Sequence, residues 1–170
     1  SNNPTLRVSP IALGAEAAHA VDAKLVCDMT FTPLTLTAGD HGADLIMHSM
    51  TKYIGGKSAD LGGFVAGSED DMNALMDLHH GRRMLGGGVM APSVAREFLQ
   101  NVVDLPERLV GASKNAHAVQ SIAQELGFDA TMVDDYDAYQ KLRDDTMPEE
   151  VSNGMVALFL ENQEQARAFV

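Results

Sequence analysis

Residues 43–63 read A-D-L-I-M-H-S-M-T-K-Y-I-G-G-K-S-A-D-L-G-G, with Lys52 near the centre. The apolar run at residues 45–47 has the length and character of a buried strand, and glycines follow the lysine closely. Lys52 is therefore expected where a strand gives way to a loop. Because ligands of open α/β sheets bind at the carboxyl ends of the strands, this position favours an active site. A single loop lysine is more often a solvated surface residue, so the neighbouring residues decide the interpretation.

A second polar cluster lies upstream of Lys52. Residues 23–27, A-K-L-V-C, again have the pattern of a buried strand, and they are followed directly by Asp28 and then Thr30. If the two strands run parallel, their carboxyl ends lie at the same edge of one sheet. The sequence therefore predicts an α/β fold that brings the carboxylate of Asp28 and the side-chain nitrogen of Lys52 to one edge.

The rest of the chain alternates between predicted helices and strands. Helices are expected at residues 9–21, 69–78, 92–104 and 107–126. Strands are expected at residues 62–68, 130–133 and 155–160, and the first of them reads as a short buried strand. Ser9 is expected to cap the first helix, with Pro10 at its first position. Apolar residues at helical spacing in the second helix predict a core face formed by Met72, Leu75, Met76 and Leu78.

Two motifs together resemble a known family. The segments C-D-M-T-F-T-P at residues 27–33 and G-A-D-L-I-M-H-S-M-T-K-Y-I-G-G at residues 42–56 are similar to the cofactor segment of the Cys/Met-metabolism family of pyridoxal-phosphate (PLP) enzymes. The resemblance extends to Asn3-Pro4 and to residues 62–67, and residues 76–86 and 105–108 look most like the methionine gamma-lyase branch. Several unusual residues agree at once, so the match is specific.

The resemblance implies a fold and a domain organisation. Residues 1–112 would be the C-terminal part of a PLP-dependent, aminotransferase-like (fold type I) large domain with a mainly parallel sheet. Residues 113–170 would be a bridging helix and the start of a smaller α+β C-terminal domain. The chain is then expected to be a partial chain that covers less than half of a family member.

The resemblance also implies roles for the residues at the two strand ends. Lys52 would carry PLP as an internal aldimine and act as the catalytic residue, since a lysine amine is the nucleophile of such enzymes. Asp28 would pair with the pyridine nitrogen, and a carboxylate there keeps the ring protonated and a better electron sink. The structural alternative for Asp28 is a helix or turn cap.

Four more residues are implied as cofactor-binding. Ser49 and Thr51 would contact the phosphate, Thr30 would lie beside the pyridine ring, and Asn3 would lie near the phenolic oxygen. Each also has a structural alternative: Ser49 and Thr51 could satisfy backbone groups of the loop, and Asn3 could form a turn before proline.

The implied activity is that of a PLP-dependent carbon–sulfur lyase acting on a small amino acid, in the first place methionine, with methanethiol, 2-oxobutanoate and ammonia as products. Cystathionine gamma-lyase or gamma-synthase and O-acylhomoserine sulfhydrylase use the same machinery and remain alternatives. A catalytically silent fragment and a threonine-aldolase-like PLP enzyme are further ones. The family also implies a homotetramer built as a dimer of dimers.

Composition limits the other classes of function. The 170 residues have a formal net charge of -12, and no Lys/Arg stripe is present, which argues against nucleic acid and anionic membranes as partners. No apolar run approaches the length of a membrane span. The single cysteine, Cys27, cannot form an intrachain disulfide, so a reducing cytoplasmic location is expected.

No metal site is expected. His79 and His80 are adjacent on a predicted helix, where neighbouring side chains point about 100° apart, and no ligand-spaced partner accompanies them.

Overall fold

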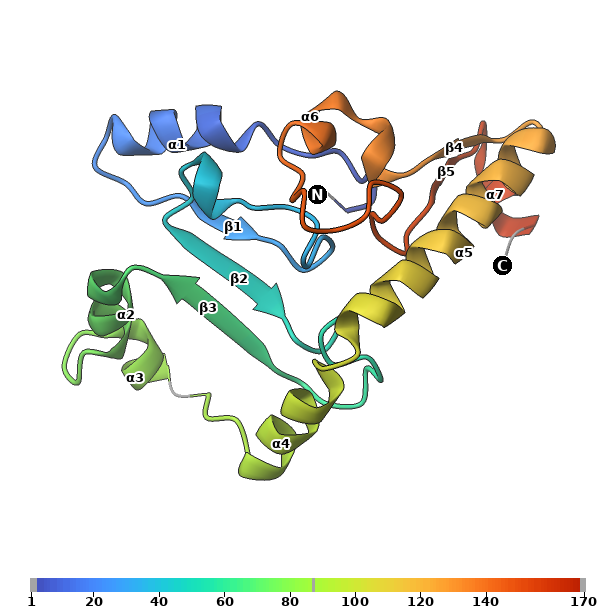
Figure 1. Ribbon diagram of the computed structural model, residues 1–170. Coiled ribbons are helices and arrows are strands. Elements are labelled where there is room, and N and C mark those ends of the chain that lie inside the picture. The colour runs from blue at the N-terminus through green and yellow to red at the C-terminus, as the bar shows by residue number, and fades with distance from the viewer. Residues whose placement is uncertain (1–2, 87, 169–170) are drawn as a thin grey trace.

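The computed structural model describes residues 3–86 and 88–168, which form two small sheets with helices around them (Figure 1). In chain order the elements are α1 (Ile11–His19), β1 (Val26–Asp28), η1 (Gly39–His41), β2 (Leu45–Ser49), β3 (Gly63–Gly67), α2 (Glu69–Met76), α3 (Arg82–Gly86), α4 (Pro92–Asn101), α5 (Leu105–Glu125), β4 (Asp129–Thr131), η2 (Val133–Asp135), α6 (Asp137–Gln140), β5 (Ala157–Phe159) and α7 (Gln163–Ala168). The helices predicted at residues 92–104 and 107–126 correspond to α4 and α5, and the bounds of β4 and β5 differ by one or two residues from those of the predicted strands.

The larger sheet has the strand order β1-β2-β3. β1 and β2 are parallel, with Val26 opposite Leu45 and Asp28 opposite Met47. β2 and β3 are antiparallel, with Ser49 opposite Gly63. The predicted α/β class is confirmed, while the described part of the sheet is mixed, because the chain returns from β2 through a loop without a crossover helix.

Helix α1 covers one face of this sheet. Ile11 is 7% exposed and belongs to the main hydrophobic core, against which Cys27 of β1 and Ile46 of β2 pack. The prediction of Ser9 as the cap was wrong. Pro10 occupies the N-cap position with no side-chain hydrogen bond, and its carbonyl accepts the first helical bond, from the backbone N–H of Gly14 at 3.0 Å.

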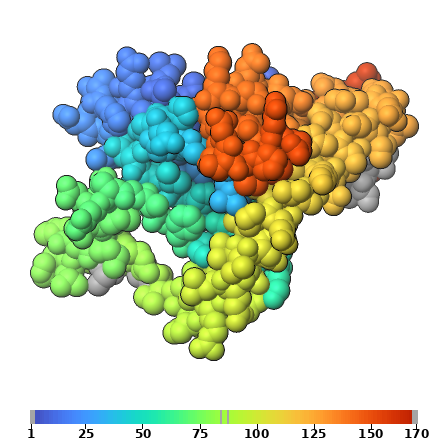
Figure 2. All heavy atoms as spheres, viewed as in Figure 1, coloured from blue at the N-terminus to red at the C-terminus, as the bar shows by residue number. Residues whose placement is uncertain are grey.

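The C-terminal part of the chain completes the same core. Val133 and Tyr139 are fully buried in it, and Leu142 is 7% exposed. Figure 2 shows this segment, in orange, lying over the N-terminal segment and the segment after β1. The backbone N–H of Asp144 donates to the carbonyl of Thr35 at 2.9 Å. The two parts of the chain therefore share a core, and the proposed division at residues 112/113, which falls inside the continuous helix α5, stays a prediction.

The long helix α5 runs diagonally from α4 to the small sheet of β4 and β5 (Figure 1). Its first turn contains Pro106, which is tolerated there because the first helical N–H groups have no intrahelical partner.

Burial differs from the prediction around β3 and α2. β3 was predicted to be buried, yet all five of its residues are exposed. The predicted core face of α2 is also largely uncovered, since Met76 is 52% and Leu78 70% exposed. Helix α2 lies against β3 but leaves these side chains largely open. Apolar spacing alone specifies which residues share a face, not what covers it.

Among the described helices, none combines the length and apolar character that crossing a bilayer requires.

Asp44 joins the end of α1 to the starts of β1 and β2. Its carboxylate accepts hydrogen bonds from the backbone N–H of Leu25 at 2.7 Å and from Nε2 of His19 at 2.9 Å, and it lies 3.5 Å from Nζ of Lys24. The His19 hydrogen bond, then that of Leu25, lowers the pKa of Asp44 from its usual 3.8 to about 2, while partial desolvation acts in the opposite direction.

We therefore expect a pH-dependent contribution of Asp44 to stability. Because the pKa is lowered in the folded state, the contribution is complete above pH 3.8 and is lost as the pH falls toward about 2. Asp44→Asn, which keeps an acceptor but not the charge, should lower the thermal midpoint at neutral pH, and the difference from the native chain should shrink in that acidic window. A difference that stays constant down to pH 2 would show that the charge is not involved.

Candidate active site

The carboxyl ends of β1 and β2 form one edge of the sheet, as the sequence predicts. Asp28 ends β1 and Ser49 ends β2, and the parallel pairing continues one step past β1, where the backbone N–H of Met29 donates to the carbonyl of Met47 at 2.9 Å. Lys52 follows three residues after Ser49 and is exposed. A carboxylate and a lysine therefore belong to the same sheet edge.

Thr30 connects the two strand ends. Its backbone N–H donates to the Asp28 carboxylate at 2.8 Å, and its hydroxyl accepts the backbone N–H of Ser49, also at 2.8 Å. Thr30 is 8% exposed, so both bonds lie in a largely desolvated place. The Asp28–Thr30 bond is the turn-capping arrangement that was the structural alternative for Asp28. It uses one carboxylate oxygen and leaves the other able to accept a further donor.

The hydrogen bond from Ser49 to Thr30 leads to a test of this connection. Thr30→Val keeps the shape of the side chain and removes the acceptor of the Ser49 N–H, which should cost about 1–3 kcal/mol of unfolding free energy. Urea denaturation measures this loss. Thr30→Ser keeps the hydroxyl and should lose distinctly less; equal losses in both variants would mean that the methyl group, not the hydrogen bond, matters.

Lys52 lies in a closed turn, the Lys52 loop (residues 50–56). Its backbone N–H donates to the carbonyl of Ser49 at 3.3 Å, and its carbonyl accepts from the N–H of Gly56 at 3.1 Å. The loop is also tied to the start of β3, because the N–H of Met50 donates to the carbonyl of Gly62 at 2.8 Å. Within residues 3–86 and 88–168, no hydrogen bond or ion pair engages Nζ of Lys52.

Ser49 and Thr51 flank Met50 in the sequence. The Thr51 hydroxyl accepts the backbone N–H of Gly62 at 3.2 Å, which is the loop-satisfying alternative considered for it. Since this bond uses an oxygen lone pair, the hydroxyl proton remains available for an anionic ligand.

The structure brings four of the six predicted residues into one network and leaves two separate. Asp28, Thr30 and Ser49 are linked directly, and Lys52 joins Ser49 through the backbone. Thr51 bonds to Gly62 and not to these four, although it precedes Lys52 in the loop. Asn3 is exposed, and no hydrogen bond links it to the other predicted site residues in the described part of the chain. Its predicted role, like that of the others, stays a prediction.

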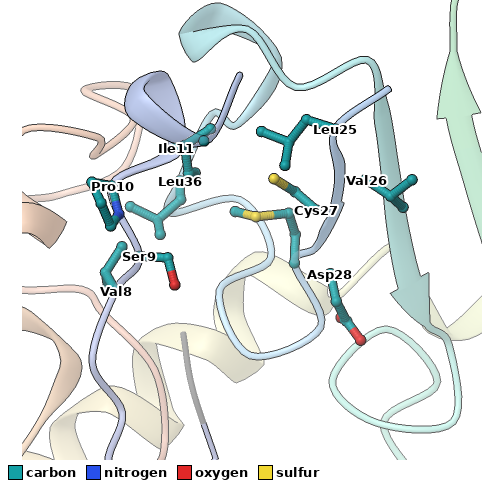
Figure 3. A pocket seen from close by; sticks show the side chains of 11 residues that line it. Val8, Ser9, Pro10, Ile11, Leu25, Val26, Cys27, Asp28 and Leu36 are labelled. Atoms are coloured by element: carbon teal, nitrogen blue, oxygen red, sulfur yellow. The ribbon is translucent and has the colours of Figure 1, made fainter. Parts of the chain in front are cut away.

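A cavity of about 480 Å³ lies between α1 and β1 (Figure 3). Its lining is mainly apolar, and Cys27 points into it together with Ile11 and Leu36, whereas the Asp28 carboxylate points away from these side chains. Burial raises the pKa of the Cys27 thiol, as expected of a packed, unreactive cysteine. Lys52 does not line this cavity, so the candidate site is the sheet edge and not the hollow behind it.

His48 packs within the sheet beside the site. Its ring stacks on that of Phe64 with 4.9 Å between centroids. Burial lowers the pKa of His48, and the charge of Asp28 opposes that shift. Nδ1 is buried without a hydrogen-bond partner among the described residues, so the stacking on Phe64 is the contact that this ring makes with the sheet.

Tyr53 makes a contact that the sequence did not indicate. Its hydroxyl accepts the backbone N–H of Gly154 at 2.9 Å, across 101 positions of the chain. Burial raises the pKa of Tyr53, although the hydrogen bond from Gly154 acts in the opposite direction. The residue next to Lys52 is thus attached to the segment before β5. No local sequence signal marks such a distant partner.

Comparison with known proteins identifies the family of this chain. The family described as Cys/Met metabolism PLP-dependent enzyme matches residues 1–135. Methionine gamma-lyase of Arabidopsis thaliana is 35% identical over 125 residues, covering 74% of this chain and 28% of that protein. L-methionine gamma-lyase of Streptomyces avermitilis is 36% identical over 115 residues, covering 67% of this chain and 26% of that protein.

A solved structure, cystathionine gamma synthase from Xanthomonas oryzae pv. oryzae, superposes with a TM-score of 0.81 at 27% identity, covering 99% of this chain and 44% of that one. The chain therefore spans less than a third of the length of the two curated relatives and less than half of the solved structure.

Proposed function

Because the chain belongs to the Cys/Met metabolism family of PLP-dependent enzymes, we propose that it contributes the cofactor-attaching part of a carbon–sulfur lyase that acts on methionine. The observation that carries this proposal is the sheet edge at which Asp28 and Ser49 end two parallel strands and Lys52 follows in the next loop. The two methionine gamma-lyases at 35% and 36% identity support the choice of substrate.

The chemistry of the donor groups suits PLP. The cofactor presents an aldehyde, a pyridine nitrogen and a phosphate. An exposed lysine nitrogen with no ion-pair partner in the described residues suits the aldehyde, and the unused oxygen of Asp28 suits the protonated ring nitrogen. The hydroxyls of Ser49 and Thr51 are donors of the kind that a phosphate accepts. The residues present therefore fit the group.

These residues would perform distinct tasks. When bound, PLP supplies an electron sink for negative charge that develops beside the substrate nitrogen. Lys52 would attach the cofactor as a nucleophile and would then carry protons between the α and β carbons of the substrate. Asp28 would keep a proton on the ring nitrogen, and the hydroxyls of Ser49 and Thr51 would orient the phosphate.

A second function, cystathionine gamma-synthase, is favoured by the superposition with the Xanthomonas oryzae enzyme. The same residues would serve it, so they do not separate the two. Assays with methionine, cystathionine and an O-acylhomoserine, each followed by product identification, choose between them. Methanethiol and 2-oxobutanoate from methionine support the lyase, and a cystathionine-forming reaction alone contradicts it.

The first experiment is incubation of the chain with PLP, reduction with borohydride and location of the label by peptide mapping. A label confined to Lys52 and absent from Lys52→Ala supports the proposal. If surface lysines such as Lys141 are labelled as strongly as Lys52, or if no lysine is labelled, the chain does not form a cofactor site.

We further propose that the protein is a homotetramer, as the family resemblance implies. We propose a cytoplasmic location, because Cys27 is unpaired and half-buried. Light scattering of the purified chain with PLP measures its mass, and a monomer would contradict the assembly.

A further inference from the structure

Arg108, in the first turns of α5, reaches back to the Lys52 loop. Nη1 of its guanidinium donates to the carbonyl of Tyr53 at 2.7 Å, and Nη2 donates to the carbonyl of Ile54 at 3.3 Å. These are the two carbonyls that immediately follow Lys52. The guanidinium therefore binds the backbone of the loop directly, across more than 50 positions of the chain.

The same guanidinium is held in place from the helix side. Nε donates to the Asp104 carboxylate at 2.9 Å, and Nη2 donates to the carbonyl of Asn101 at 2.7 Å, near the end of α4. Asn101 adds a third bond to the loop, since its side-chain amide donates to the carbonyl of Gly55 at 2.9 Å. Three consecutive carbonyls after Lys52 are thus bound by groups at the junction of α4 and α5.

Gly56 provides the space for this contact. Its φ of +73° favours glycine, and a Cβ built there would lie 2.8 Å from Cζ of Arg108. The N–H of Gly56 also donates to the carbonyl of Lys52. Gly56 therefore both leaves space for the Arg108 guanidinium and closes the turn that contains Lys52.

From these contacts we infer that Arg108 is a positioning residue for Lys52: it holds the Lys52 loop in the conformation in which the lysine reacts with the cofactor aldehyde. The inference rests on the proposed function of Lys52. Arginine suits this task because its planar fork of N–H donors binds several carbonyls at once, whereas a lysine ammonium is a single point of attachment.

Hydrogen exchange and PLP labelling of the same samples test the inference. The variants are Arg108→Met, Arg108→Lys and the matched control Arg96→Met, which removes an exposed arginine of α4 that makes no hydrogen bond or ion pair in the described residues. In Arg108→Met we expect the amides of Gly55 and Gly56 to exchange about ten-fold faster, because the loop loses its external bonds. At subsaturating PLP, the borohydride-fixed label on Lys52, relative to that on Lys141, should fall by about as much.

Arg108→Lys should show a smaller increase in the exchange of Gly55 and Gly56 and a smaller decrease in the Lys52 label. Arg96→Met should show neither change. If Arg108→Met does not fold, Arg108→Lys carries the test, with a partial loss at Lys52 expected. Unchanged labelling of Lys52 in a folded Arg108 variant, or an equal loss in Arg96→Met, overturns the inference.

If the proposed function is wrong, Lys52 of the native chain carries no label. That result overturns the cofactor role of Lys52 and the positioning role of Arg108 with it. The exchange of Gly55 and Gly56 then still measures whether Arg108 holds the loop.

Discussion

Lys52→Ala is expected to lower the turnover of methionine by roughly 100- to 10,000-fold, the range typical of a removed acid–base group. Lys52 is the lysine at the carboxyl edge of the sheet, and no other described side chain occupies its nitrogen through a hydrogen bond or ion pair. Lys52→Arg should fare no better, because a guanidinium does not lose its proton and is a poor nucleophile. Release of 2-oxobutanoate in the presence of PLP measures the effect.

The control for that variant is Lys141→Ala. Lys141 is exposed beyond α6 and makes no side-chain hydrogen bond or ion pair among the described residues, so its removal should leave turnover unchanged. A Lys52→Ala chain that turns over at the native rate would show that a different amine does the chemistry.

Tyr139→Ala is expected to reduce the unfolding free energy by about 3–5 kcal/mol, the usual cost of deleting a buried aromatic side chain. Tyr139 is fully buried in the core that also contains Ile11 and Met29, so its loss leaves a cavity between the two halves of the chain. Urea denaturation followed by circular dichroism gives the change.

Tyr139→Phe separates the ring from its hydroxyl, which donates to the carbonyl of Val151 at 3.3 Å. That variant should lose only about 1 kcal/mol. Leu13→Ala, at a position 62% exposed on α1, should change stability by less than about 0.5 kcal/mol. A Tyr139→Ala loss as small as that of Leu13→Ala would show that the shared core contributes little to folding.

The candidate site was predictable where its residues are close in the chain. Ser49, Thr51 and Lys52 lie within four positions, and a strand followed by glycines determines where they emerge from the sheet. Asp28 could be added because two apolar runs predict two strands. Their parallel pairing, which brings Asp28 to the same edge, agrees with the structure.

Burial was the least predictable property. The apolar pattern predicted a buried β3 and a core face on α2, and both are largely exposed among the described residues. Periodicity records which side chains share a face, whereas burial depends on which other segment reaches that face. The segment that does complete the main core is residues 133–142, far along the chain from α1.

The sequence by itself determined the strand ends, the helix α5 and the polar residues next to Lys52 in the chain, because local spacing and turn-forming residues control these features. Only the tertiary structure decided that Thr30 bonds to Ser49, that Tyr53 meets Gly154 and that Arg108 holds the carbonyls after Lys52. Each of these contacts joins a side chain to a backbone group of a kind that nearly every residue carries, over separations of 19 to 101 positions. Side-chain identity therefore gives no sign of the partner, and only folding of the chain brings the two groups within hydrogen-bond distance.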